Sequence, residues 1–246
     1  SAAGGIARAE GLPTYPWQLA PYWRHSEEAA ELLQKSAEFP LLGKRSPGPD
    51  PIWTNEVSLG AFPYLRDHVV GGDVVFPAAG FIEIMLCAGR EIFGDVPLEI
   101  EDFEILAALF VGTDEHVLFS TRLDVDRHLV HIRTRTRDGA SEWTIRASAQ
   151  IRPTDIRPEL RLPRDELSGA PTSGDDFYAQ TALAGFGYGP AFRAIASATV
   201  AAHSAAGVIA APEQVSLEGS LAHPCLLDAA LQLTIAMVTG ARGDAA

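Results

Sequence analysis

The sequence is poor in cysteine and in cationic residues, and it contains no long apolar run. Its two cysteines, Cys87 and Cys225, form no CxxC pair, so neither a disulfide framework nor a thiolate metal site is indicated. Lys and Arg number 19 against 32 Asp and Glu, and the net charge of −13 disfavours binding to nucleic-acid phosphates. No apolar segment reaches the roughly 20 residues that a membrane-spanning helix needs, and the first residues lack the pattern of a secretion signal. We therefore expect a cytoplasmic protein with reduced thiols and with no nucleic-acid or membrane partner.

Proline is concentrated in the first 50 residues and again after residue 152. The stretches LPTYPW at 12–17 and SPGPD at 46–50 exclude a regular helix there. Their aromatic neighbours indicate a linker that docks on an adjacent domain, with a disordered tag as the alternative. An apolar content of 47% suffices for one large core or for two small cores that share an interface. We expect a linker at 1–38, a first unit at 39–152, an inter-unit linker at 153–174 and a second unit at 175–246.

Hydrophobic periodicity predicts a long helix followed by an antiparallel meander in the first unit. Pro77 opens an apolar stretch over 78–93 with a helical period, and Gly94 ends it. Immediately before it, VVGGDVV at 69–75 predicts a tight hairpin. Strand-like segments follow at 98–111, 116–125, 129–136 and 143–151. An antiparallel sheet that must cover one face with an early helix predicts the hot-dog arrangement, in which the sheet wraps the helix.

The second unit again contains an apolar helix that starts at a proline. A short helix is expected at 175–184, the segment 195–210 is rich in small and β-branched residues, and Pro224 opens an apolar helix over 225–238. Many buried helices begin at proline, so this repeat leaves open whether the two units are duplicates.

His68 stands directly before the predicted hairpin, where residues 68–77 read HVVGGDVVFP and match HxxxGxxxxP. We expect its ring to face the apolar interior, where a neutral imidazole can accept a proton and act as a general base. A strand histidine that only satisfies its hydrogen bonds is the alternative. The surrounding motif favours the base.

Asp228 lies in HPCLLDAALQ at 223–232, among residues that belong in a core. Burial raises the pKa of a carboxyl group, which suits an acid that donates a proton to a departing hydroxyl. Gln232 is four residues further on, so it shares a helical face with Asp228 and can orient it. Alternatively, an aspartate in the first turns of a helix only stabilises the helix dipole.

The segment 185–192 reads GFGYGPAF, and its spaced glycines resemble a nucleotide-binding turn. It lacks the third spaced glycine and the preceding buried strand of that motif, which excludes this interpretation. We expect a glycine-rich turn that presents Tyr188 and Phe192, with a plain loop as the alternative.

Together, these three segments resemble the HxxxGxxxxP, YGPxF and DxxxQ motifs of dehydratase domains from modular type I polyketide synthases. FPLLG at 39–43 resembles the start of that domain's first strand, and 12–17 resembles the linker that follows an acyltransferase domain. The resemblance implies an α+β double hot-dog fold, with two antiparallel sheets each wrapped around a long central helix. It also implies strands after the second helix, so we expect the second hot dog to be incomplete at the C-terminus, because the sequence ends at Ala246.

The resemblance further implies removal of water from a 3-hydroxyacyl chain on the phosphopantetheine arm of an acyl carrier protein, giving a trans-2-enoyl thioester. His68 would remove the α-proton and Asp228 would protonate the departing hydroxyl. The implied substrate-binding residues are Gly72, Pro77, Tyr188, Pro190, Phe192 and Gln232, with the backbone around Gly72 as a donor to the thioester oxygen. No metal and no diffusible cofactor is implied. The implied partners are an acyl carrier protein, neighbouring synthase domains and a second copy in a homodimer.

Two other functions fit the same pattern. The same pair could shift a double bond or close an oxygen ring beside an enoyl thioester, because each reaction needs only proton transfer. A non-catalytic module could bind an acyl chain or act as a scaffold for the synthase dimer, although the presence of both His68 and Asp228 argues against it.

Overall fold

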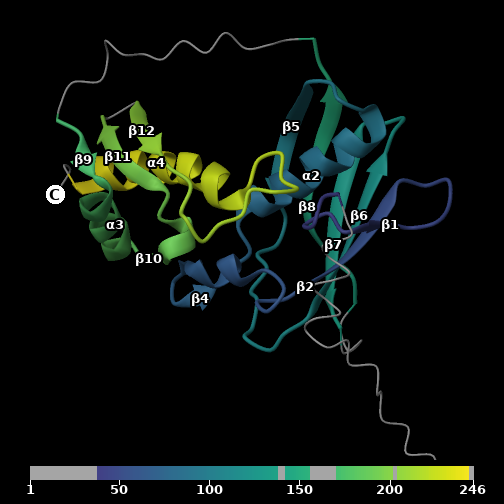
Figure 1. The fold of residues 1–246 in the computed structure, drawn as a ribbon, viewed down its shortest axis with the longest axis horizontal. Coiled ribbons are helices and arrows are strands. Elements are labelled where there is room, and N and C mark those ends of the chain that lie inside the picture. Colours follow the sequence, from purple (N-terminus) through teal and green to yellow (C-terminus); the bar gives the residue numbers. More distant parts are fainter. Residues whose placement is uncertain (1–37, 138–141, 156–169, 202–203, 244–246) are drawn as a thin grey trace, which may run out of the picture.

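The computed structural model describes residues 38–137, 142–155, 170–201 and 204–243. The expected N-terminal linker, including LPTYPW at 12–17, lies outside these residues. Figure 1 shows two parts side by side, one formed by residues before 156 and the other by residues after 169. No helix among the described residues is long and apolar enough to cross a membrane.

The first part is an antiparallel sheet of six strands that packs on one long helix. Its order is β1 (Lys44–Arg45), β2 (Ile52–Val57), β6 (Val117–Asp124), β7 (Leu129–Thr136), β8 (Thr144–Pro153) and β5 (Leu98–Ile105). Side chains alternate between the two faces of a strand, and along β7 Val130 and Ile132 point inward and are fully buried. One face of this sheet is therefore core.

Helix α2 (Ala78–Phe93) lies against this face, and the expected helix over 78–93 is confirmed. Pro77 is its N-cap, and at its end Gly94 adopts a φ of 81° while its N–H bonds to the Arg90 carbonyl. A Cβ on Gly89 would lie 2.6 Å from Ile151 Cδ1 of β8, so the glycine permits the helix to approach the sheet closely. The sheet and α2 thus form the expected hot dog.

The expected strand over 98–111 is wrong beyond Ile105. A register shift between Glu101 and Glu104 disturbs β5, and its pairing with β8 ends at Ile105. The chain then changes partner: the Phe76 N–H donates to the Leu109 carbonyl and the Val111 N–H to the Val74 carbonyl, at 2.8 and 3.0 Å.

A small sheet, with order β10-β3-β4, joins the two parts. The expected hairpin is confirmed as β3 (His68–Val70) and β4 (Asp73–Val74), with Gly71 and Gly72 at φ values of 64° and 98° in the turn. On its other side, β3 pairs with β10 (Phe186–Tyr188), which places Tyr188 opposite His68. The segment expected as a glycine-rich turn is therefore partly a strand, because β3 offers it an unpaired edge.

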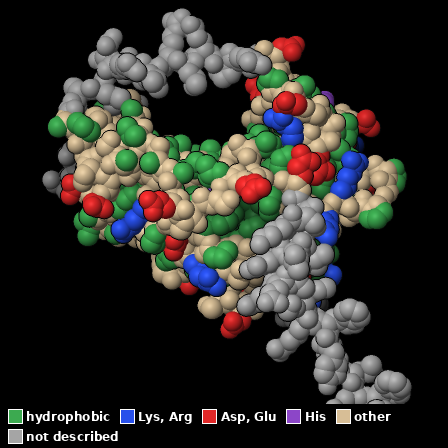
Figure 2. Space-filling view, in the orientation of Figure 1, with side chains coloured by type: hydrophobic (Ala, Val, Ile, Leu, Met, Phe, Trp, Pro, Cys, Tyr) green, Lys and Arg blue, Asp and Glu red, His purple; other side chains and the backbone are tan. Residues whose placement is uncertain are grey.

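The second part has a three-stranded sheet with order β12-β11-β9 and two helices. The strands are β9 (Thr172–Ser173), β11 (Ile195–Val200) and β12 (Ala205–Ile209), and the helices are α3 (Gly174–Leu183) and α4 (Pro224–Gly243). Both helices were expected, and Ser173 caps α3 by accepting the Asp176 N–H. Helix α4 packs against β11, β12 and α2, so the two long helices meet between the parts. Figure 2 shows hydrophobic side chains gathered in the hollow between these parts.

Candidate active site

The hairpin that precedes α2 fixes the ring of His68. Its Nδ1 lies 2.7 Å from the Val75 carbonyl oxygen, and the Val75 N–H donates to the His68 carbonyl. A carbonyl oxygen only accepts hydrogen bonds, so in the neutral ring Nδ1 carries the proton and Nε2 keeps a free lone pair. The side chain is buried, with 7% of the residue exposed. The ring is therefore arranged to accept a proton at Nε2.

Asp228 reaches this nitrogen from the other part of the molecule. Its Oδ1 lies 3.7 Å from His68 Nε2, across a separation of 160 positions in the chain. The residue is 5% exposed. Burial raises the pKa of the Asp228 carboxyl above its ordinary value, and His68 and the Gln232 hydrogen bond only partly oppose this. The shift is therefore toward the protonated form, which can donate a proton.

Gln232 orients the carboxyl group, as its spacing predicts. Its Nε2 donates to Asp228 Oδ2 at 2.8 Å and to the Phe192 carbonyl at 3.1 Å. Its Oε1 lies 3.1 Å from the hydroxyl of Tyr178, which also accepts the Ile195 N–H at 3.0 Å. These contacts distinguish the amide nitrogen of Gln232 from its amide oxygen. Tyr178 was missed by sequence reasoning, because an aromatic residue on a short helix carries no local sign of this contact.

Tyr188 and Phe192 form an aromatic wall beside His68. Their ring centroids lie 5.8 and 5.0 Å from that of the imidazole, and both residues are buried. Burial, together with the nearby Asp228, raises the pKa of the Tyr188 phenol, so it stays a hydrogen-bond donor. The two aromatic residues that the sequence singled out are therefore both at the site.

Asp67, the residue before His68, holds this wall in place and was also missed by sequence reasoning. Its Oδ2 accepts the Ala191 N–H at 2.7 Å, and its backbone carbonyl accepts the Gly189 N–H at 2.8 Å. Asp67 therefore fixes the YGPxF segment against the strand that carries the histidine.

Three of the expected substrate-binding residues, Gly72, Pro190 and Pro77, are not part of this cluster of side chains. Gly72 is exposed in the turn of the hairpin, at the end away from His68. Pro190 is exposed at the start of a short 3-10 helix (Pro190–Phe192). Pro77 is buried as the N-cap of α2. Pro77 therefore marks the start of the helix that follows the hairpin.

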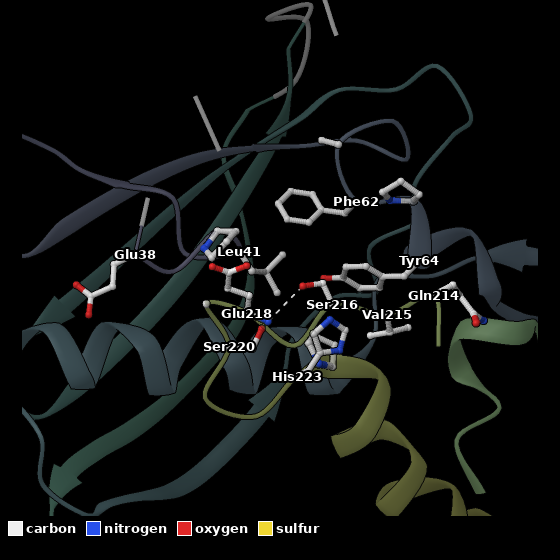
Figure 3. Close-up of a pocket in the computed structure, with 15 residues that line it drawn as sticks. Glu38, Leu41, Phe62, Tyr64, Gln214, Val215, Ser216, Glu218, Ser220 and His223 are labelled. Carbon is white, nitrogen blue, oxygen red and sulfur yellow. Dashed lines mark hydrogen bonds between the residues drawn. The ribbon is translucent and has the colours of Figure 1, made fainter. Parts of the chain in front are cut away.

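A cavity of about 860 Å³ lies beside Tyr64 and His223 (Figure 3). Its lining comes from residues 38–41, 61–64 and 214–224. Tyr64 belongs to this lining, and its ring centroid lies 6.3 Å from that of Phe192 and 5.1 Å from that of His223. Burial lowers the pKa of His223 to about 4, so its ring is neutral near neutral pH. The lining residue Tyr64 thus packs near Phe192, whereas His68 and Asp228 do not line this cavity. Within the described ranges, no three His, Cys, Asp or Glu side chains come together as possible metal ligands.

Comparisons with known proteins agree on one family. Residues 39–137 match a family model described as polyketide synthase dehydratase domain, and residues 157–246 match one described as polyketide synthase dehydratase N-terminal domain. A phenolphthiocerol/phthiocerol polyketide synthase of Mycobacterium tuberculosis is 33% identical over an alignment of 257 positions, gaps included, that covers 94% of this chain and 14% of that protein. The chain therefore spans about a seventh of that relative.

Solved structures share the fold. The dehydratase domain from the CurF module of curacin polyketide synthase has a TM-score of 0.70 at 22% identity, covering 82% of this chain and 77% of its own. Two CurK dehydratase structures, described as inactive mutants with an aspartate changed to asparagine and a histidine changed to phenylalanine, have TM-scores of 0.66 and 0.68 at 22% and 24% identity. They cover 76% and 79% of this chain and 70% and 72% of their own. These likenesses confirm the double hot-dog fold.

Proposed function

The chain belongs to the family of polyketide synthase dehydratase domains, and from this premise we propose that it removes water from a 3-hydroxyacyl thioester carried on an acyl carrier protein. The product is the trans-2-enoyl thioester, which makes the domain a hydro-lyase. The observation that carries the proposal is the pair formed by His68 Nε2 and Asp228 Oδ1 at 3.7 Å, one group from each part of the molecule.

The two groups divide the proton transfers of the elimination. His68 Nε2 removes the α-proton, whose bonding electrons form the new double bond as the C–O bond to the β-carbon breaks. Asp228 donates its proton to the departing hydroxyl, which leaves as water. One proton has then moved to His68 and one has left Asp228, and transfer from imidazolium to carboxylate restores the starting state.

The neighbouring residues support these roles. The bond from Nδ1 to the Val75 carbonyl keeps the basic nitrogen of His68 directed at Asp228. Gln232 holds the carboxyl group, and Tyr188 is placed to donate a hydrogen bond to the substrate. The two inactive CurK mutants carry one replaced histidine and one replaced aspartate, which agrees with a reaction that needs both residue types.

The wider setting is proposed from the length of the relatives. The chain covers a small part of a large synthase, which supports neighbouring synthase domains and a carrier protein as partners. No metal and no diffusible cofactor enters the proposed reaction, because the elimination needs only the two proton transfers assigned to His68 and Asp228. We also propose a homodimer, and light scattering that finds only a 26.3 kDa species at micromolar concentration would contradict it.

A comparison of two variants tests the division of roles. Asp228→Asn keeps the size of the carboxyl group but removes the proton donor, so water loss should fall by about 10²–10⁴-fold. With a saturated acyl thioester in deuterated buffer, exchange of the α-proton needs only His68 and should persist. His68→Ala should abolish both the exchange and the water loss. Near wild-type dehydration by either variant would contradict the proposal.

A further inference from the structure

A buried carboxylate on α2 lies outside all three motifs. Glu83 is 1% exposed, on a helix whose other buried residues are small or apolar. Placing a carboxylate in such surroundings is unfavourable unless its oxygens accept hydrogen bonds. Its partners therefore show what it stabilises.

Two of these partners belong to the segment that leads into α4. Glu83 Oε1 accepts the Leu221 N–H at 2.9 Å, and Oε2 accepts the Ala222 N–H at 2.6 Å. A third donor, the thiol of Cys87, lies 3.3 Å from Oε1 on the same helix. Hydrogen bonds to an ionised acceptor are short and stronger than those between neutral groups. Glu83 therefore links α2 to residues that stand 138 and 139 positions further along the chain.

This link lies on the path to Asp228. Ala222 is followed by His223, whose carbonyl accepts the N–H groups of Leu226 and Leu227 as α4 begins. Asp228 is the next residue. The link also reaches back to His68, because the Val75 carbonyl that binds the imidazole stands two residues before Pro77, the N-cap of α2. Helix α2 is thus connected through residues 75–77 to the base at its start and, through Glu83, to the segment that leads into the acid's helix.

We propose that Glu83 is a positioning residue, which holds the start of α4 against α2 and thereby places the Asp228 carboxyl beside His68 Nε2. The proposal rests on the proposed function. Glu83 is buried and both of its oxygens accept backbone N–H groups, so we give it no contact with substrate. Glu83 acts through Asp228 alone.

The test replaces Glu83 by glutamine. In Glu83→Gln the side-chain NH₂ group meets a backbone N–H, so one hydrogen bond is lost and α4 is no longer held at both points. A displacement of about 1 Å at a reacting group lowers turnover by about 10²-fold, and we expect a fall of that order in kcat for water loss. KM and the His68-driven exchange of the α-proton should stay near wild type, because neither depends on Asp228.

The matched control is Glu91→Gln on the same helix. Glu91 Oε2 accepts the Trp53 indole N–H at 2.7 Å, so this variant makes the same chemical change away from α4. It should leave dehydration near wild type. An equal loss of kcat in both variants would overturn the proposal.

A double-mutant cycle separates positioning from general weakening of the fold. If Glu83 acts through Asp228, then adding Glu83→Gln to Asp228→Asn should lower water loss no further. Multiplied losses, or loss of exchange in step with water loss, would overturn the proposal. Should Glu83→Gln fail to fold, Glu83→Asp, which keeps the charge but shortens the reach, takes its place with the same expected pattern. Absence of dehydration in the wild type would instead count against the proposed function.

Discussion

Gly189, between β10 and the short helix at Pro190–Phe192, stands where the fold leaves no room for a side chain. A Cβ built there would lie 2.5 Å from Asp67 Cγ and 2.8 Å from Asp67 Cβ, and would also overlap Oδ1. Because the Cβ of Asp67 is among the atoms met, rotation of the carboxylate alone does not relieve the clash. Gly189→Ala therefore requires Asp67 or the YGPxF segment to move.

The size of the effect follows from two contributions. Overpacking of this kind lowers the free energy of unfolding by about 1–3 kcal/mol. A displaced Asp67 also gives up its bond to the buried Ala191 N–H, and an unsatisfied buried donor lowers it by a further ~1–3 kcal/mol. We expect a total loss of about 2–6 kcal/mol, together with slower dehydration, because Tyr188 and Phe192 move with the segment.

Urea unfolding measures this loss, and Gly187→Ala, two residues earlier on β10, is the matched control. Its Cβ would meet Val69 Cβ at 3.4 Å, which is ordinary contact, so its free energy of unfolding should change by no more than about 0.5 kcal/mol. Equal stability of the Gly189→Ala and Gly187→Ala proteins would refute the reasoning.

Three further predictions concern the groups around the pair. Gln232→Leu removes a hydrogen bond that lowers the pKa of Asp228, so this pKa should rise. The alkaline limb of the kcat–pH profile should then move to higher pH, and a move to lower pH would contradict this. The pKa of His223 is about 4 in the folded protein against an ordinary 6.5, so the unfolded state binds more protons between these values and stability is lost as pH falls through them. His223→Asn should flatten the pH dependence of urea unfolding in that interval, and an unchanged slope would argue against it. Tyr178→Phe leaves the buried Ile195 N–H without its acceptor and should lower the free energy of unfolding by about 1–3 kcal/mol, while a neutral result in urea would count against the contact.

Local signals sufficed for the elements on which the site is built. Pro77 and Gly94 bound α2 as expected, and the two glycines after Val70 give the hairpin that orients His68. These features depend on the backbone preferences of single proline and glycine residues, so they can be predicted from the sequence alone. The three motifs also place His68, Asp228 and the aromatic wall at one site.

Contacts between distant segments could not be predicted in this way. In the sequence, Glu83 is a charged residue in a largely apolar helix. Only the fold shows that it accepts hydrogen bonds from the N–H groups of Leu221 and Ala222. The strand at 186–188 likewise forms because the edge of β3 is available to it, and its own glycines argue against a strand. Partners more than a hundred residues away decide both features.

The mass of the product tests the central claim most directly. Wild-type protein, His68→Ala and Asp228→Asn are incubated with a 3-hydroxyacyl thioester on acyl carrier protein. The mass of the acyl group is measured by mass spectrometry, and its retention time is compared with that of a trans-2-enoyl standard. The account predicts loss of one water in the wild type only, with the product matching the standard. An unchanged mass in the wild type, or water loss by either variant at the wild-type rate, would contradict it.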